Sequence, residues 1–99
     1  MNSYLQRAWS DYISDITIAD IDTVIIETQE MDDEHGAFWV GVNDEEYILE
    51  VDKFLDMVLT VDDDETHLKA KNWEEVRYLY EVLLASDFEI LVSHFKNES

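Results

Sequence analysis

Carboxylates are the most abundant reactive side chains in this sequence, and many of them lie in three short runs. Such runs can bind hard cations, supply an acid/base pair to a catalytic cleft, or present negative charge to a basic partner. We take the following as candidate binding residues: Asp32, Asp33, Glu34, Asp44, Glu45, Glu46, Asp62, Asp63, Asp64 and Glu65.

The cation-binding interpretation lacks a supporting motif. A calcium loop beginning at Asp62 would need Gly at its sixth position and Glu at its twelfth, where the chain has His67 and Trp73. A loop beginning at Asp32 fails in the same way, because Ala37 is its sixth residue. The three histidines have no zinc-ligand spacing, and there is no cysteine. We expect no resident metal or cofactor, and loose binding of divalent cations to the acidic runs is the alternative.

Catalysis is not indicated either. The chain has only two glycines, no glycine-rich phosphate loop and no GxSxG motif. With 25 acidic residues some pair of carboxylates will always be close, so the presence of pairs carries no information. We therefore expect a protein that is not an enzyme.

The charge balance restricts the partners. The sequence has 25 acidic residues against 6 Lys and Arg, and its formal net charge is −19. Nucleic acids and anionic membranes are held by cationic side chains, so we expect this protein to bind neither directly. Without cysteine, a secretory leader or an apolar run long enough to span a bilayer, it is expected in the cytoplasm.

The remaining pattern predicts one α+β domain over residues 1–99. A capping box at Ser3 and Gln6 followed by helical spacing predicts an N-terminal helix over 4–14, and β-branched residues predict a strand over 23–29. Two further strands, 37–42 and 46–51, are predicted to form a hairpin. Residues 30–36 between these strands are predicted to form a turn.

Mixed spacing over 52–60 favours a short helical turn that runs into a strand ending at Val61. The acidic turn 62–65 then leads into a strand over 66–71. Asn72 with Glu75 forms a capping box for a second helix, at about 73–85, and alternation predicts a last strand over 87–95 with a frayed tail at 96–99. The prediction is an antiparallel sheet of hairpins with both helices packed on one face.

The aromatic residues are mostly core residues by their spacing. Tyr78 is the exception, because it falls outside the apolar stripe of the second predicted helix, and we expect it to face a partner. The other aromatic residues considered are Tyr4, Trp9, Tyr12, Phe38, Trp39, Tyr47, Trp73 and Tyr80.

The acidity exceeds what solubility requires, since a net charge of about 2 to 8 in magnitude suffices for a small domain. Residues 11–65 carry nineteen acidic residues and one basic residue, Lys53. A rigid scaffold with carboxylates in this density can imitate the phosphates of nucleic acid and attract a basic groove. The alternative is that each run is an ordinary solvated turn.

In size, acidity, absence of cysteine and layout of elements, the chain resembles the small acidic inhibitors of bacteriophages and mobile elements. These include the anti-CRISPR, anti-restriction and uracil-glycosylase-inhibitor proteins, many of which imitate DNA. The resemblance is one of layout, without a shared motif, and it implies a non-catalytic inhibitor that occupies the nucleic-acid site of a basic nuclease or another DNA-processing enzyme. Two alternatives are an immunity protein or antitoxin for a cognate nuclease toxin, and a regulatory module whose acidity serves solubility.

Overall fold

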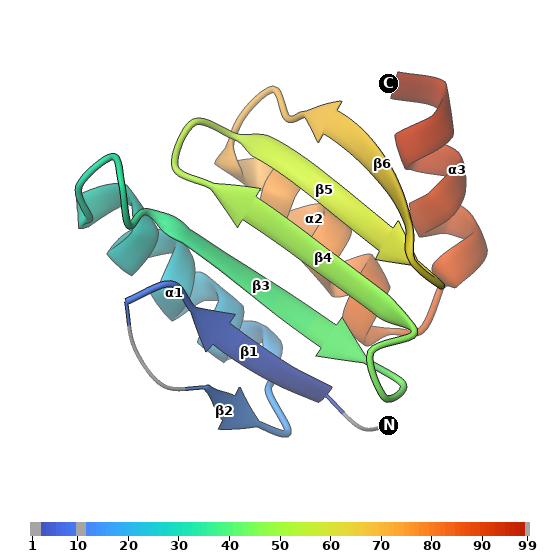
Figure 1. Ribbon diagram of the computed structural model, residues 1–99, viewed down its shortest axis with the longest axis horizontal. Coiled ribbons are helices and arrows are strands. Elements are labelled where there is room, and N and C mark those ends of the chain that lie inside the picture. Colours follow the sequence, from blue (N-terminus) through green and yellow to red (C-terminus); the bar gives the residue numbers. More distant parts are fainter. Residues whose placement is uncertain (1–2, 10–11, 99) are drawn as a thin grey trace.

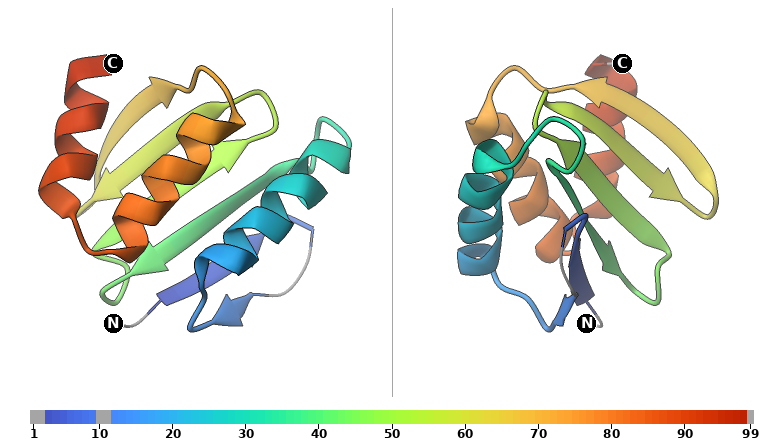
Figure 2. Two further views of the ribbon diagram at one scale, coloured as in Figure 1. Left: turned by 180° about the vertical axis from the view of Figure 1, so that it is seen from behind. Right: turned by 60° about the vertical axis from the view of Figure 1, so that its left-hand side comes forward.

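A computed structural model describes residues 3–9 and 12–98 of the chain. Six strands form one antiparallel sheet in the order β2-β1-β3-β4-β5-β6 (Figure 1). Three helices lie on the same face of this sheet, and its other face is not covered by any helix of the described chain (Figure 2). The elements are β1 Ser3–Arg7, β2 Ile13–Ser14, α1 Ile18–Glu30, β3 Ala37–Val42, β4 Tyr47–Asp52, β5 Asp56–Val61, β6 Asp64–Lys69, α2 Trp73–Leu84 and α3 Phe88–Glu98.

The α+β class, the antiparallel sheet and the central hairpins are confirmed. In the first hairpin Val42 pairs with Tyr47 and Ala37 pairs with Asp52, so the strands run the full length of the sheet. In the last hairpin Val61 pairs with Asp64. The short helical segment expected after β4 is a turn, and β5 ends at Val61 as predicted.

The second helix is also confirmed. The Asn72 side chain accepts a hydrogen bond from the Glu75 backbone N–H at 2.9 Å, which satisfies one of the free donors at the start of α2. The Glu75 carboxylate accepts from the backbone of Lys71 at 2.7 Å, one residue before the position a capping box would use. On the inner face of α2, Tyr80 is fully buried and donates its hydroxyl to the carbonyl of Leu49 at 2.8 Å.

The predicted N-terminal helix is wrong. Residues 3–7 form β1, which pairs with β3 over its whole length and with the short β2 on its other side. Leu5 is fully buried while its neighbours Tyr4 and Gln6 are only partly buried, which is the alternation of a strand that has one face on the core. The helical spacing in this segment is real, but pairing with β3 decides the conformation. Residues 10 and 11 of the predicted helix lie outside the described part of the chain.

The predicted strand at 23–29 is wrong as well, because this segment belongs to α1. Its inward face is formed by Ile21, Val24, Ile25 and Thr28, which follow the 3-and-4 spacing of a helix. The Asp20 carboxylate accepts the backbone N–H of Thr17 at 2.8 Å and so begins the helix. The β-branched side chains lower helix propensity only slightly, and burial of the apolar Ile21, Val24 and Ile25 outweighs that cost.

The last predicted strand is a helix, α3, which continues through most of the segment expected to fray. Leu91 and Phe95, four residues apart, are fully buried, whereas Ile90 is 50% exposed, as expected for the two faces of a helix. α3 packs on α2 and β6, and it completes the cover over one face of the sheet. The sheet therefore ends at β6 and presents its opposite face outward.

Candidate functional site

The topology brings two of the three acidic runs together. The β3–β4 and β5–β6 turns lie at the same end of the sheet, at the lower right of Figure 1. They are adjacent, because Tyr47 pairs with Val61 and the backbone N–H of Asp62 donates to the carbonyl of Glu46 at 3.2 Å. We call this the acidic end, and it comprises Asp44, Glu45, Glu46, Asp62, Asp63, Asp64 and Glu65, all of them exposed.

The basic residues lie elsewhere in the described structure. Arg7, Lys53 and Lys69 are at the opposite end of the sheet, where they pair with Glu27 at 2.8 Å, Asp33 at 3.5 Å and Asp56 at 3.4 Å. Arg77 lies in the helix layer and pairs with Asp22 of α1 at 2.6 Å and with Glu81. The other two basic residues are Lys71, which precedes α2, and Lys96, in the last turn of α3. The acidic end thus contains no Lys or Arg to offset its charge.

Both turns of the acidic end depend on left-handed backbone conformations. In the β3–β4 turn φ is 52° at Asn43, 56° at Asp44 and 70° at Glu45. In the β5–β6 turn it is 49° at Asp62 and 72° at Asp63. Asn and Asp adopt this region more readily than most residues, so these residue types suit the turns structurally as well as electrostatically.

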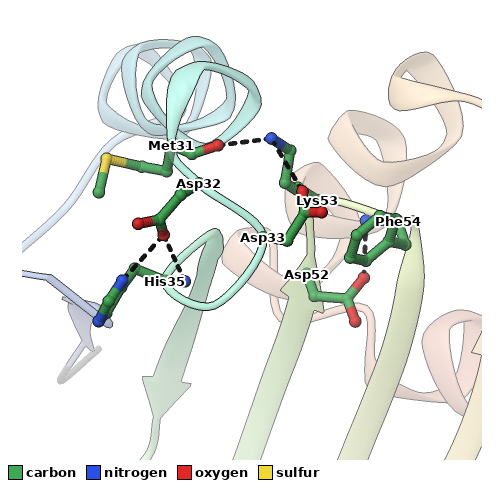
Figure 3. Close-up of polar contacts among 7 residues, drawn as sticks. All are labelled: Met31, Asp32, Asp33, His35, Asp52, Lys53 and Phe54. Carbon is green, nitrogen blue, oxygen red and sulfur yellow. Dashed lines mark hydrogen bonds and ion pairs between the residues drawn. The ribbon is translucent and has the colours of Figure 1, made fainter.

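The third acidic run lies at the opposite end, in the loop between α1 and β3, and it has a structural role. The Asp32 carboxylate accepts from the backbone N–H of His35 at 3.0 Å and contacts the His35 ring nitrogen Nδ1 at 2.8 Å (Figure 3). These hydrogen bonds hold the pKa of Asp32 below its ordinary value. Lys53 reaches across from the β4–β5 turn, donates to the carbonyl of Met31 and pairs with Asp33. Asp32 thus stabilises the loop itself, and Asp33 links the loop to the β4–β5 turn.

The uncovered sheet face combines aromatic, apolar and acidic side chains. One row of paired positions crosses the strands at Gln6, Trp39, Glu50, Val58 and His67. A second row, closer to the acidic end, contains Tyr4, Gly41, Ile48, Thr60 and Glu65. Burial, followed by the negative charges of Asp52 and Glu65, raises the pKa of Glu50. The acidic character of the turns thus extends onto this face.

The aromatic residues are less buried than the spacing predicted. Only Phe38 and Tyr80 of those considered are fully buried, and they stack on each other with ring centroids 5.2 Å apart. Tyr78 is 48% exposed, which agrees with its position outside the apolar stripe, and its ring lies 6.3 Å from that of His94. Tyr12 is 61% exposed and was missed as a surface residue, because the segment was interpreted as a helix. Once residues 3–7 are known to form a strand, alternation places Tyr4 on the outer face, where Trp39 of the correctly predicted strand β3 also lies.

Within the described residues, no group of three or more His, Asp or Glu side chains is arranged to hold a metal ion. The acidic end is dense in charge, but its carboxylates do not converge as metal ligands do. No helix in the described parts of the chain is both long and apolar enough to cross a membrane.

Comparisons with known proteins found no match: no family model, no curated protein and no solved structure matches this chain. Any functional conclusion therefore depends on the surface chemistry itself.

Proposed function

We propose that this protein is a non-catalytic inhibitor that occupies the nucleic-acid-binding site of a basic nuclease or another DNA-processing enzyme, in the manner of the phage anti-CRISPR and anti-restriction proteins. The observation that carries the proposal is the acidic end, where seven exposed acidic residues, five in two adjacent turns and two at the start of β6, lie together without a Lys or Arg among them. A basic groove lowers its electrostatic energy when it contacts such a surface, as it does when it contacts phosphates.

The arrangement of the turns supports this function. Neighbouring strands lie about 4.8 Å apart and successive outward residues of one strand about 6.8 Å apart, so carboxylates on adjacent hairpins form a closely spaced negative surface. Both hairpins belong to one hydrogen-bonded sheet, with β3–β4 at its centre and β5–β6 at its edge, and this pairing limits the motion of the turns. A negative surface that is rigid before binding loses less conformational entropy when the partner docks.

One observation favours the alternative, an immunity protein or antitoxin that neutralises a cognate nuclease toxin. The third acidic run lies at the far end of the sheet, where Asp32 bonds to His35 of the same loop and Asp33 pairs with Lys53 of the β4–β5 turn. The three runs therefore do not form one continuous row along the molecule. A partner that binds through a shape-specific patch, away from its own substrate groove, would need no such row.

Neutralising part of the acidic end tests the proposal. The variant Asp62→Asn, Asp63→Asn, Asp64→Asn removes three charges from the proposed surface. The control variant Glu30→Gln, Glu74→Gln, Glu89→Gln removes the same number from exposed positions of the helix layer. Against a panel of nucleases and CRISPR or restriction effectors, we expect the first variant to associate more slowly and to inhibit less, and the control to behave like the parent protein, because charges at an interface act mainly on the association rate.

Competition decides between the two functions. The inhibitor and duplex DNA should exclude each other from the target. A ternary complex that holds both, or equal effects of the two triple variants, would refute groove occupation and favour the immunity protein.

A further inference from the structure

The uncovered face of the sheet contains a pocket at its β2–β1–β3 side, next to the acidic end. The pocket has a volume of about 480 Å³ and is lined by Tyr4, Gln6, Tyr12, Trp39 and Glu45 together with two serines. Volumes of this order accept small ligands or a single large side chain. Three aromatic residues and one carboxylate line a single site, although they come from four different segments of the chain.

The rings are arranged to surround a ligand. Tyr4 and Tyr12 meet edge to face, with centroids 6.3 Å apart and an angle of 84° between their planes. Trp39 is the diagonal neighbour of Tyr4 on the adjacent strand. Tyr4 pairs with Gly41, and Trp39, two residues before Gly41, pairs with Gln6. Tyr4, Tyr12 and Trp39 thus line one pocket, and the electron-rich face of an aromatic ring is the part that attracts cationic groups.

The Tyr4 ring is fixed in this position. It lies directly on Gly41, where a Cβ atom would come within 2.4 Å of the Tyr4 Cε1 atom, so only glycine allows the ring to approach β3. The Tyr4 hydroxyl donates to Glu45 Oε1 at 3.1 Å, which also holds the carboxylate beside the pocket. A second, adjoining pocket of about 350 Å³ is lined by Tyr4, Gly41, Asp44 and Glu45. The carboxylates therefore flank the aromatic site on its acidic side.

We propose that this pocket binds an arginine side chain of the basic protein partner. A guanidinium group is planar, so it stacks on aromatic rings, and its forked N–H groups match a carboxylate such as Glu45. A lysine ammonium is a compact and strongly hydrated charge that would use the rings and the carboxylate less fully. The inference rests on the proposed function for the basic nature of the partner. It adds the contact that would slow dissociation, whereas the acidic end accelerates association.

The test uses the intact protein and a short peptide probe, acetyl-Gly-Arg-Gly-amide, in an NMR titration. We expect dissociation in about the millimolar range, with shifts centred on the Trp39 indole and the Tyr4 and Tyr12 rings. The peptide in which neutral citrulline replaces arginine has nearly the same shape without the charge, and it should bind at least tenfold more weakly. The lysine peptide should bind several-fold more weakly than the arginine peptide.

Variants locate the site. Trp39→Leu and Tyr12→Ala should each weaken arginine-peptide binding by about two- to tenfold, the range expected for loss of one cation–π contact. Tyr12 is largely exposed, so its variant keeps the test valid if Trp39→Leu fails to fold. Phe54→Ala, which removes an exposed ring from the β4–β5 turn at the other end of the sheet, should leave binding unchanged.

Equal binding of the citrulline or lysine peptide, unchanged affinity in the Tyr12 variant, or shifts confined to the turn 62–65 would each overturn the proposal. The peptide titration needs no nuclease, so it can fail while groove occupation stands. Conversely, groove occupation can fail in the competition assay while the arginine pocket remains.

Discussion

Glu50 lies on the uncovered sheet face close to other carboxylates. It lies between Trp39 of β3 and Val58 of β5, and Asp52 and Glu65 add their negative charges. Burial and these charges raise the pKa of Glu50 in the folded protein. A carboxyl group with a raised pKa stabilises the fold while it is protonated, and this stabilisation is lost as the pH rises through the folded-state pKa.

The change Glu50→Gln should therefore stabilise the protein at neutral pH. Urea unfolding of both proteins across a pH series measures the effect. We expect the variant to be the more stable at pH 7, and the difference to shrink as the pH falls below the pKa of a free glutamate, where both side chains are neutral. Glu34→Gln, in the exposed loop before β3, removes an equal charge and serves as the control. A stabilisation by Glu50→Gln that does not depend on pH would contradict the assignment.

At the scale of elements, the hairpins determine where the charge is placed. The β5–β6 connection has only two residues, Asp62 and Asp63, between the paired positions Val61 and Asp64. Both have positive φ, as a two-residue type I′ turn requires, and the turn sequence that best fits this geometry is Asn-Gly. The turn thus keeps two carboxylates at the acidic end at some cost in backbone strain.

Replacing Asp63 by Gly should relieve that strain. Glycine adopts a positive φ without a steric penalty but loses more entropy on folding, so we expect a net gain of about 0.5 to 1 kcal/mol in the free energy of unfolding. Asp64→Asn is the matched control, because it removes one charge from the same hairpin at a strand position with no positive φ. Denaturant unfolding that gives equal gains for both variants would attribute the effect to charge instead of to the backbone.

At the scale of the whole molecule, opposite charges are separated. Ion pairs involving Arg7, Lys53 and Lys69 lie at one end of the sheet, and Arg77 pairs within the helix layer. The other end has seven acidic residues and no Lys or Arg. Like-charge repulsion at the acidic end opposes the compact state, and it is reduced by dissolved salt.

The thermal midpoint should therefore rise as NaCl increases from about 10 mM to about 150 mM, where the Debye length falls from roughly 30 Å to 8 Å. The variant Asp62→Asn, Asp63→Asn, Asp64→Asn should melt higher at low salt and respond less to salt. Thermal melts of both proteins check this. A midpoint of the parent protein that falls steadily over this range would mean that the attractive ion pairs outweigh the repulsion.

The sequence by itself determined the features that depend on local signals. The net charge of −19 follows from composition alone. The central hairpin follows from two apolar runs around Asn43-Asp44-Glu45, of which Asn43 and Asp44 are residue types suited to a left-handed turn. α2 follows from the Asn72 cap and a complete apolar stripe. In these segments residue propensity, apolar pattern and turn residues all favour the same structure. The tertiary contacts therefore agree with the local preference.

Tertiary structure decided the conformation of the segments whose apolar residues fit both the helical and the alternating strand spacing. Residues 4–14 and 87–95 contain apolar residues at helical and at alternating positions, and the outcome depended on which neighbour could cover them. β1 forms because β3 offers a free edge, while α3 forms because β6 and α2 present a surface that buries Leu91 and Phe95. The same long-range pairing joins two acidic turns at one end and places Tyr4, Tyr12 and Trp39 around one pocket. No local pattern encodes such proximity, because it arises from the order of strands in the sheet.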